Sequence, residues 1–156
     1  KRNRLVEEAQ GASIAMCDDD NLYGPAYLET MVLRLVASGA AVVSLAGYYG
    51  VSMYDGSWEY YKNVGGRGET HVFWKHGDLE FDDSVTWGEE TRFVDVARDK
   101  GLHRVWDDAG IFLHIGHGRN LTAVHPEQHD TIDGDWKATT HGIQCVSFFT
   151  CDVILL

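Results

Sequence analysis

Apolar and polar residues alternate along the chain in patterns that predict both strands and helices. Residues 13–17 form a short apolar run that ends in three aspartates, and residues 41–45 form a second apolar run, so we expect two buried strands. Between them, apolar side chains recur at steps of three and four from Tyr27 to Val36, which predicts a helix that ends at Gly39. A strand, a helix and a strand within about 35 residues have the size of a βαβ unit. The pattern therefore predicts a parallel sheet with a right-handed crossover.

The same reasoning predicts further elements later in the chain. Residues 48–54 and 57–61 flank Asp55-Gly56, a pair that is typical of a hairpin turn. The other expected elements are helices at residues 4–10 and 89–100 and strands at 70–74, 103–106 and 111–115. We divide the chain into a folded region, residues 1–122, and a C-terminal segment, residues 123–156, whose pattern does not define a structure.

The charge balance limits the classes of partner. The net charge is −11, from 24 acidic and 13 basic residues, which argues against a nucleic-acid binder because phosphates require a basic surface. Cys17, Cys145 and Cys151 form no close metal-binding pair, and their odd number favours a reducing compartment. The sequence has no apolar run long enough for a transmembrane helix. We expect a cytoplasmic protein, with peripheral association at the inner face of the membrane only through a longer parent chain.

The first candidate site is the acidic cluster after the first predicted strand. In an extended stretch, the side chains of Asp18 and Asp20 face the same way, so both carboxylates can address one cation. Oxygen ligands of this kind suit Mg²⁺ or Mn²⁺, and such a cation can neutralise a diphosphate leaving group. A solvated turn beside a helix N-terminus is the alternative that the spacing leaves open. A calcium-binding EF-hand loop is excluded because Tyr23 stands where that loop requires glycine.

Two other positions are candidates for chemistry. Glu89 completes a capping box with Thr86, which leaves the carboxylate of Glu90 available for another role. His117 follows a predicted strand, and the pattern alone favours a loop histidine that is hydrogen-bonded to the backbone. We expect the side chain of His114 to point to the opposite face.

Taken in order, these motifs resemble the pattern of glycosyltransferase family 2 over roughly the first 120 residues. Members of that family have an arginine-asparagine pair that opens a helix, then a strand that ends in a D-x-D motif, then an acidic pair. The residues that carry the resemblance are Arg2-Asn3, residues 14–21, residues 66–90 and His117-Gly118-Arg119-Asn120. The resemblance implies a partial GT-A-type (Rossmann-like) α/β fold, with a mixed, mainly parallel sheet flanked by helices. The family's strands that hold the nucleotide base would precede Arg2.

The resemblance also implies an activity, which is that of an inverting, metal-dependent glycosyltransferase of the hexosyltransferase type. Such an enzyme moves a sugar from a nucleoside diphosphate-sugar donor to a hydroxyl of a carbohydrate or other acceptor, with Mn²⁺ or Mg²⁺ as cofactor. The family's catalytic base corresponds to Glu90, with Glu89 beside it. The implied nucleotide-sugar-binding residues are Arg2, Asn3, Asp18, Asp19 and Asp20. The implied metal ligands are Asp18, Asp20 and His117.

Two other functions remain open at this point. A truncated or degenerate relative would bind carbohydrate or a partner protein without turnover, and the lack of base-holding strands before Arg2 favours this hypothesis. On this view the isolated chain is inactive. A metal-dependent phosphohydrolase would use the same aspartates, but Leu22 stands where one large phosphatase family has threonine.

Overall fold

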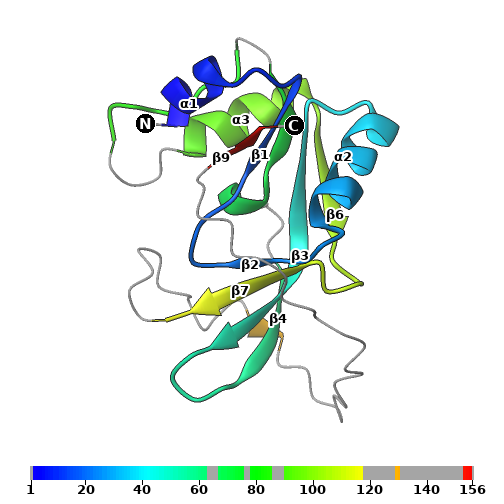
Figure 1. Cartoon of the computed structure of the whole chain (residues 1–156), viewed down its shortest axis with the longest axis vertical. Helices are drawn as coiled ribbons and strands as arrows, with labels where there is room; N and C mark the ends of the chain where they lie inside the picture. The colour runs from blue at the N-terminus through cyan, green and yellow to red at the C-terminus, as the bar shows by residue number, and fades with distance from the viewer. Residues whose placement is uncertain are drawn as a thin grey trace.

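The strand β3 (Val42–Ser52) is the axis of the sheet (Figure 1). The structure is a computed structural model, and it describes residues 2–62, 67–75, 78–85, 90–117, 129–130 and 153–155. Four strands pair with β3: β4 (Trp58–Lys62) and β5 (Val72–Trp74) antiparallel to it, and β6 (Leu102–Trp106) and β7 (Phe112–Gly116) parallel to it. Gly47 pairs with both Lys62 and Trp106, so β4 and β6 flank β3 on opposite sides.

The remaining elements extend the sheet and cover it. Strand β1 (Ser13–Met16) pairs with β5, and β2 (Leu22–Tyr23) pairs with β7. The helical elements are α1 (Arg2–Glu8), α2 (Tyr27–Ser38), the 3₁₀ turn η1 (Gly68–Thr70) and α3 (Glu90–Lys100). Within the C-terminal segment, β8 (His129–Asp130) pairs with β4 and β9 (Val153–Leu155) pairs with β1. The other residues of 118–156 lie outside the described part of the chain.

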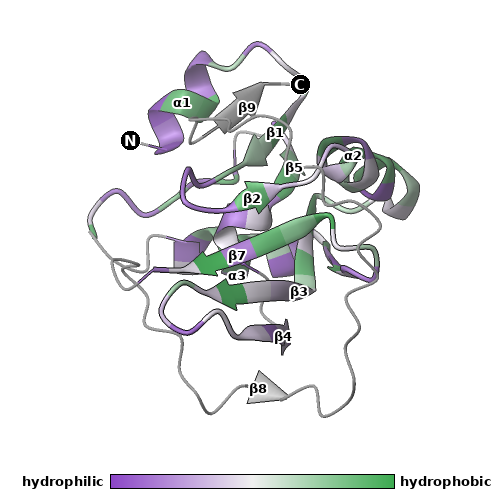
Figure 2. Ribbon diagram, turned by 60° about the horizontal axis from the view of Figure 1, so that its bottom comes forward, coloured by the Kyte–Doolittle hydropathy of each residue, from purple (hydrophilic) through white to green (hydrophobic). Residues whose placement is uncertain are grey.

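Two apolar cores cover the two faces of the sheet. On one face, the side chains of Tyr27, Met31 and Leu35 in α2 are buried against the strands. On the other face, Phe93 of α3 and Val6 of α1 belong to a second buried cluster. Figure 1 shows α2 on one side of the sheet and α1 and α3 on the other, and Figure 2 shows both polar and apolar residues on α2, of which Leu33 and Val36 are exposed. Burial of an apolar stripe from each helix is the main stabilising contribution to this arrangement.

The ends of the helices are fixed by specific contacts. Gly39 ends α2 in the left-handed conformation, with φ of 64°, and its N–H donates a hydrogen bond to the carbonyl of Val36. The ammonium of Lys75, just after β5, donates hydrogen bonds to the carbonyl oxygens of Glu7 (3.0 Å) and Ala9 (2.7 Å). Because these carbonyls lie at the end of α1, the lysine satisfies groups that the helix cannot pair and ties α1 to the sheet.

Most of the predicted elements are confirmed. The predicted hairpin exists, since Val51 pairs with Trp58 across Asp55-Gly56. The strands predicted at 41–45 and 48–54 form one continuous strand, β3, because Gly47 between them pairs with strands on both sides. None of the helices in the described ranges is both long and apolar enough to cross a membrane.

The prediction of a mainly parallel sheet is wrong. Six of the eight strand pairings among the described residues are antiparallel, so the sheet is mixed and mostly antiparallel. Strands β1 and β3 do run in the same direction, as the βαβ pattern predicts, because both pair antiparallel with β5. Strand β5, which follows β4 in the chain, lies between β1 and β3. The local periodicity of the sequence does not reveal this placement.

His71 is a buried polar residue between η1 and β5. Its side chain is fully buried and its ring stacks on Phe93 with the ring centroids 5.3 Å apart. Neither ring nitrogen has a hydrogen-bond partner among the described residues. Burial lowers the pKa of His71 to about 4, so the folded protein holds this imidazole neutral.

We predict that this histidine makes the protein less stable in acid. The unfolded chain binds a proton at His71 near the ordinary pKa of about 6.5, whereas the folded protein does so only near pH 4, so stability falls as the pH drops through this window. In urea denaturation, His71→Leu should lose roughly 2 kcal/mol less than the parent between pH 7 and pH 4.5. The matched control is His103→Leu, and equal losses in the two variants would contradict the prediction.

Candidate functional site

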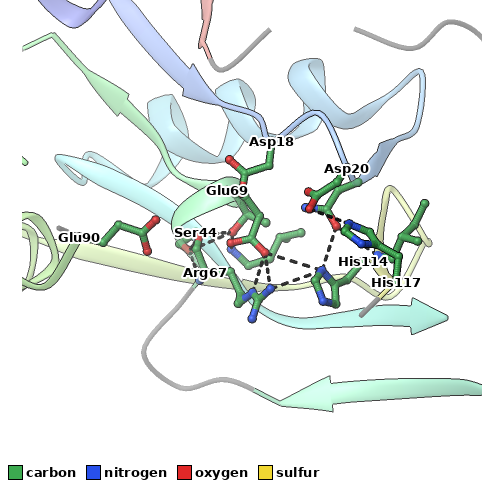
Figure 3. Close-up of polar contacts among 12 residues, drawn as sticks. Asp18, Asp20, Ser44, Arg67, Glu69, Glu90, His114 and His117 are labelled. Carbon is green, nitrogen blue, oxygen red and sulfur yellow. Dashed lines mark hydrogen bonds and ion pairs between the residues drawn. The ribbon is translucent and has the colours of Figure 1, made fainter. Parts of the chain in front are cut away.

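Charged side chains from four separate segments gather beside the ends of β1 and β7. Figure 3 shows Asp18 and Asp20 from the turn after β1, Arg67 and Glu69 from the η1 region, Glu90 from α3, and His114 and His117 from β7 and the residue that follows it. We call this group the acidic site. Strand β3 pairs with both β5 and β7, and β5 also pairs with β1. This pairing brings η1 and the end of β7 close to the turn after β1.

The η1 turn is fixed to β3 by hydroxyl groups. The hydroxyl of Thr70 donates to the carbonyl of Arg67 at 2.8 Å and accepts from the N–H of Leu45 at 3.1 Å. The hydroxyl of Ser44 accepts from the N–H of Arg67 at 3.2 Å. The backbone of Arg67 is therefore held at a fixed place beside the central strand.

Arg67 and Glu69 form an ion pair within the site. Both Nε and Nη2 of Arg67 lie 2.6 Å from Oε1 of Glu69, and Glu69 is only 6% exposed. The guanidinium carbon also lies 5.5 Å from the ring centre of Tyr48. This pair was not among the site residues predicted from the sequence. The available signal was an arginine and a glutamate two residues apart in a glycine-rich loop, where the charges usually face solvent.

Tyr23 links the acidic turn to η1. Its hydroxyl accepts a hydrogen bond from the N–H of Asp18 at 2.9 Å and donates one to the carbonyl of Glu69 at 3.0 Å. The ring packs edge-on to Tyr27 of α2, with centroids 4.9 Å apart. The position of Asp18 therefore depends on a tyrosine that lies five residues further along the chain.

The three aspartates have different surroundings. Residues 19–20 form a turn, so the extended arrangement that the sequence analysis assumed for Asp18 and Asp20 is wrong. Oδ1 of Asp18 lies 3.6 Å from Nη2 of Arg2, whereas Oδ2 of Asp20 lies 3.1 Å from Nε2 of His117. Asp19 is exposed. Burial, with the nearby charge of Glu69, raises the pKa of Asp18 to about 7.

His114 belongs to the site, contrary to the prediction that its side chain points away from that of His117. Nδ1 of His114 lies 2.8 Å from Oδ1 of Asn21, which also accepts the N–H of Ile115 at 3.1 Å. Nδ1 of His114 also lies 3.4 Å from Nη2 of Arg67, so the imidazole contacts both Asn21 and Arg67. Burial and the charge of Arg67 lower the pKa of His114 to about 4. Because β7 ends at Gly116, the alternation of faces does not continue to residue 117, and Figure 3 shows both imidazoles beside Asp20.

The residues present fit a cation in part. Among the described residues, no group of three or more His, Cys, Asp and Glu side chains converges as an all-protein metal centre. Asp20 and His117 do lie together, and the charge of Asp20 acts on Asp18. Mg²⁺ and Mn²⁺ in nucleotide sites need only one or two protein carboxylates, since phosphate oxygens and waters complete their coordination. Asp20 and His117 are therefore the residues best placed to hold such an ion, with Asp18 next to them.

Glu90 lies at the opposite side of the site, in the first turn of α3. Its Oε1 lies 2.6 Å from Nη1 of Arg2, and its side chain is 35% exposed. Gly68 lies directly against this carboxyl group, because a Cβ atom at that position would overlap it. The glycine therefore makes the room that Glu90 occupies. Glu89, the other predicted member of the acidic pair, lies outside the described residues.

The side-chain amide of Asn3 forms hydrogen bonds to other residues of the protein. Its Nδ2 donates to the carbonyl of Phe81 at 2.8 Å, and its Oδ1 accepts the N–H of the same residue at 2.8 Å. Nδ2 also lies 2.9 Å from Oδ2 of Asp83. These bonds hold the segment around Phe81 against α1. The contact with a nucleotide that the resemblance implies for Asn3 stays a prediction.

Comparison with known proteins adds no assignment. The chain matches no protein-family profile, and no curated protein matches it. The function must therefore be inferred from the residues of the acidic site and from their geometry.

The Arg67–Glu69 pair provides a test of the site's electrostatics. Glu69→Ala should destabilise the protein by about 3 kcal/mol, because it leaves the guanidinium of Arg67 without its buried partner. The matched control is Glu8→Ala, which removes the exposed pair with Arg4 and should cost less than about 0.5 kcal/mol. Urea denaturation at pH 7 measures both, and equal small losses would show that Arg67 is well solvated without Glu69.

Proposed function

We propose that the acidic site transfers a sugar from a nucleoside diphosphate donor to a hydroxyl of an acceptor, with inversion. The observation that carries the proposal is the grouping of Asp20 and His117 on one side of the site and of Glu90 on the other, with Arg2 between Asp18 and Glu90. A cation-compatible pair opposite a partly exposed carboxylate is the arrangement that a metal-dependent displacement requires. The class is a metal-dependent glycosyltransferase.

Glu90 is the base in this proposal. Its carboxylate takes the proton of the acceptor hydroxyl while the acceptor oxygen attacks the anomeric carbon. A new carbon–oxygen bond forms as the bond between that carbon and the diphosphate oxygen breaks, and the electron pair leaves with the nucleoside diphosphate. The 35% exposure of the Glu90 side chain supports the assignment, because a base must be reached by its substrate.

The donor side of the site includes the turn of Asp18, Asp19 and Asp20. When bound, Mn²⁺ or Mg²⁺ would neutralise the diphosphate leaving group, and Asp20 and His117 would hold it. Arg2 adds a guanidinium at the same side of Asp18, and guanidinium groups bind phosphate oxygens in pairs. The acceptor, a carbohydrate or another hydroxyl compound, would approach from the side of Glu90.

The fold is compatible with the GT-A-type arrangement that we infer for this class. Asp18 follows the carboxyl end of β1, and β1 and β3 run in the same direction with helices on both faces of the sheet. Ligands of open α/β sheets bind outside the carboxyl ends of such strands. The finer assignment to a partial GT-A fold remains part of the proposal.

A non-catalytic binding module is the second candidate. It is favoured by one observation, the ion pair of 2.6 Å between Glu90 and Arg2, because a carboxylate held by a guanidinium is a weak base. In such a module the site would bind nucleotide or carbohydrate without turnover.

Calorimetry tests the donor site directly. We expect UDP or GDP, or one of their sugars, to bind in the presence of Mn²⁺, and Asp20→Ala to weaken that binding at least tenfold because it removes a carboxylate from the cation. The matched control is Asp95→Ala on the exposed face of α3, which should bind as the parent does. If nucleotides bind equally well without Mn²⁺ or with Asp20→Ala, the proposed donor site is wrong.

A further inference from the structure

Arg2 is shared by the two sides of the acidic site. Its Nη1 lies 2.6 Å from Oε1 of Glu90, and its Nη2 lies 3.6 Å from Oδ1 of Asp18. The first contact is a short charge-assisted hydrogen bond, and the second is a longer ion pair. One guanidinium thus links the proposed base to the turn that follows β1.

Several carboxylates surround Arg2 in the acidic site. The site contains the carboxylates of Asp18, Asp20, Glu69 and Glu90. Arg67, the other arginine of the site among the described residues, is held by Glu69 through two contacts of 2.6 Å. Within the part of the chain that the structure describes, Arg2 is therefore the guanidinium that contacts both Glu90 and Asp18.

The surroundings of Arg2 allow its hydrogen bonds to change without moving the helix. The guanidinium carbon lies 5.5 Å from the ring centre of Phe81, and Asn3 fixes the backbone of Phe81 through two hydrogen bonds of 2.8 Å. The aromatic ring is thus a fixed platform on which the planar group can turn. The carboxyl of Glu90 also lies against Gly68, a contact that does not involve Arg2.

We propose that Arg2 is a positioning residue that couples the arrival of the diphosphate to the release of Glu90. Before the donor binds, Arg2 holds Glu90 in an ion pair. A diphosphate beside Asp18 competes for the same guanidinium, because it offers paired oxygens with more charge than one carboxylate. Arg2 then turns toward the diphosphate, and Glu90 is left as a free carboxylate that accepts the proton of the acceptor. This order reconciles the ion pair with the catalytic role, and it rests on the proposed function.

A double-mutant cycle on ligand binding tests the coupling. The probes are inorganic pyrophosphate and UDP, each with Mg²⁺, titrated by calorimetry into the parent, Glu90→Gln, Arg2→Met and the double variant. Glu90→Gln should tighten pyrophosphate binding about tenfold because it frees Arg2, and the same change should have less than a twofold effect in the Arg2→Met background. Arg2→Lys should restore part of the coupling. Glu80→Gln, which removes an exposed partner of Arg92, is the matched control for the loss of one negative charge.

The outcomes separate the coupling from the proposed function. An equal gain from Glu90→Gln in both arginine backgrounds would overturn the coupling, even if UDP binds and sugar transfer is observed. A gain that requires Arg2, in a protein that transfers no sugar, would support the coupling and overturn the proposed transfer. If neither probe binds the parent, both inferences are wrong.

Discussion

The pairing of β3 with strands on both of its sides is the constraint on which the rest of the structure depends. Its first half lies between β5 and β6, and its second half lies between β4 and β7. Every other described strand joins the sheet through one of these neighbours. Gly47 and Gly50 make this possible, because rings from neighbouring strands lie directly over them where a side chain would overlap. The hydroxyl of Ser44, on the same strand, fixes Arg67. The acidic site is thus assembled on β3, although most of its residues come from elsewhere.

The site combines a buried polar framework with carboxylates that are partly exposed to solvent. Thr70 and Tyr23 hold the η1 turn and the acidic turn through hydrogen bonds to the backbone. Among the described residues, the ion pairs of Arg67 with Glu69 and of Arg2 with Glu90 then place two guanidinium groups beside the carboxylates of the site. Ion pairs of this kind, buried or partly exposed, contribute little net stability compared with apolar packing. In the proposed function, these charges bind a charged ligand rather than stabilise the fold.

Most of the helices and strands could be predicted from the sequence, whereas the pairing of the strands with one another could not. The helix that ends at Gly39 and the hairpin at Asp55-Gly56 are set by local periodicity and turn residues, which the chain shows directly. The insertion of β5 between β1 and β3 depends on contacts between distant segments and has no local signal. The same limit applies to the site. Asp20 and His117 were predicted together from a resemblance, but the role of His114 was missed because strand alternation fails where β7 ends.

Analysis of the transfer product tests the central claim most directly. The parent, Glu90→Gln and Gly68→Ala would be incubated with nucleoside diphosphate sugars, Mn²⁺ and a set of hydroxyl acceptors, and the anomeric configuration of the product followed by proton NMR. The account predicts an inverted product from the parent, at least a hundredfold slower transfer by Glu90→Gln, and slower transfer by Gly68→Ala, whose new methyl group displaces the carboxyl of Glu90. A product with retained configuration, or transfer that is unchanged in Glu90→Gln, would contradict it.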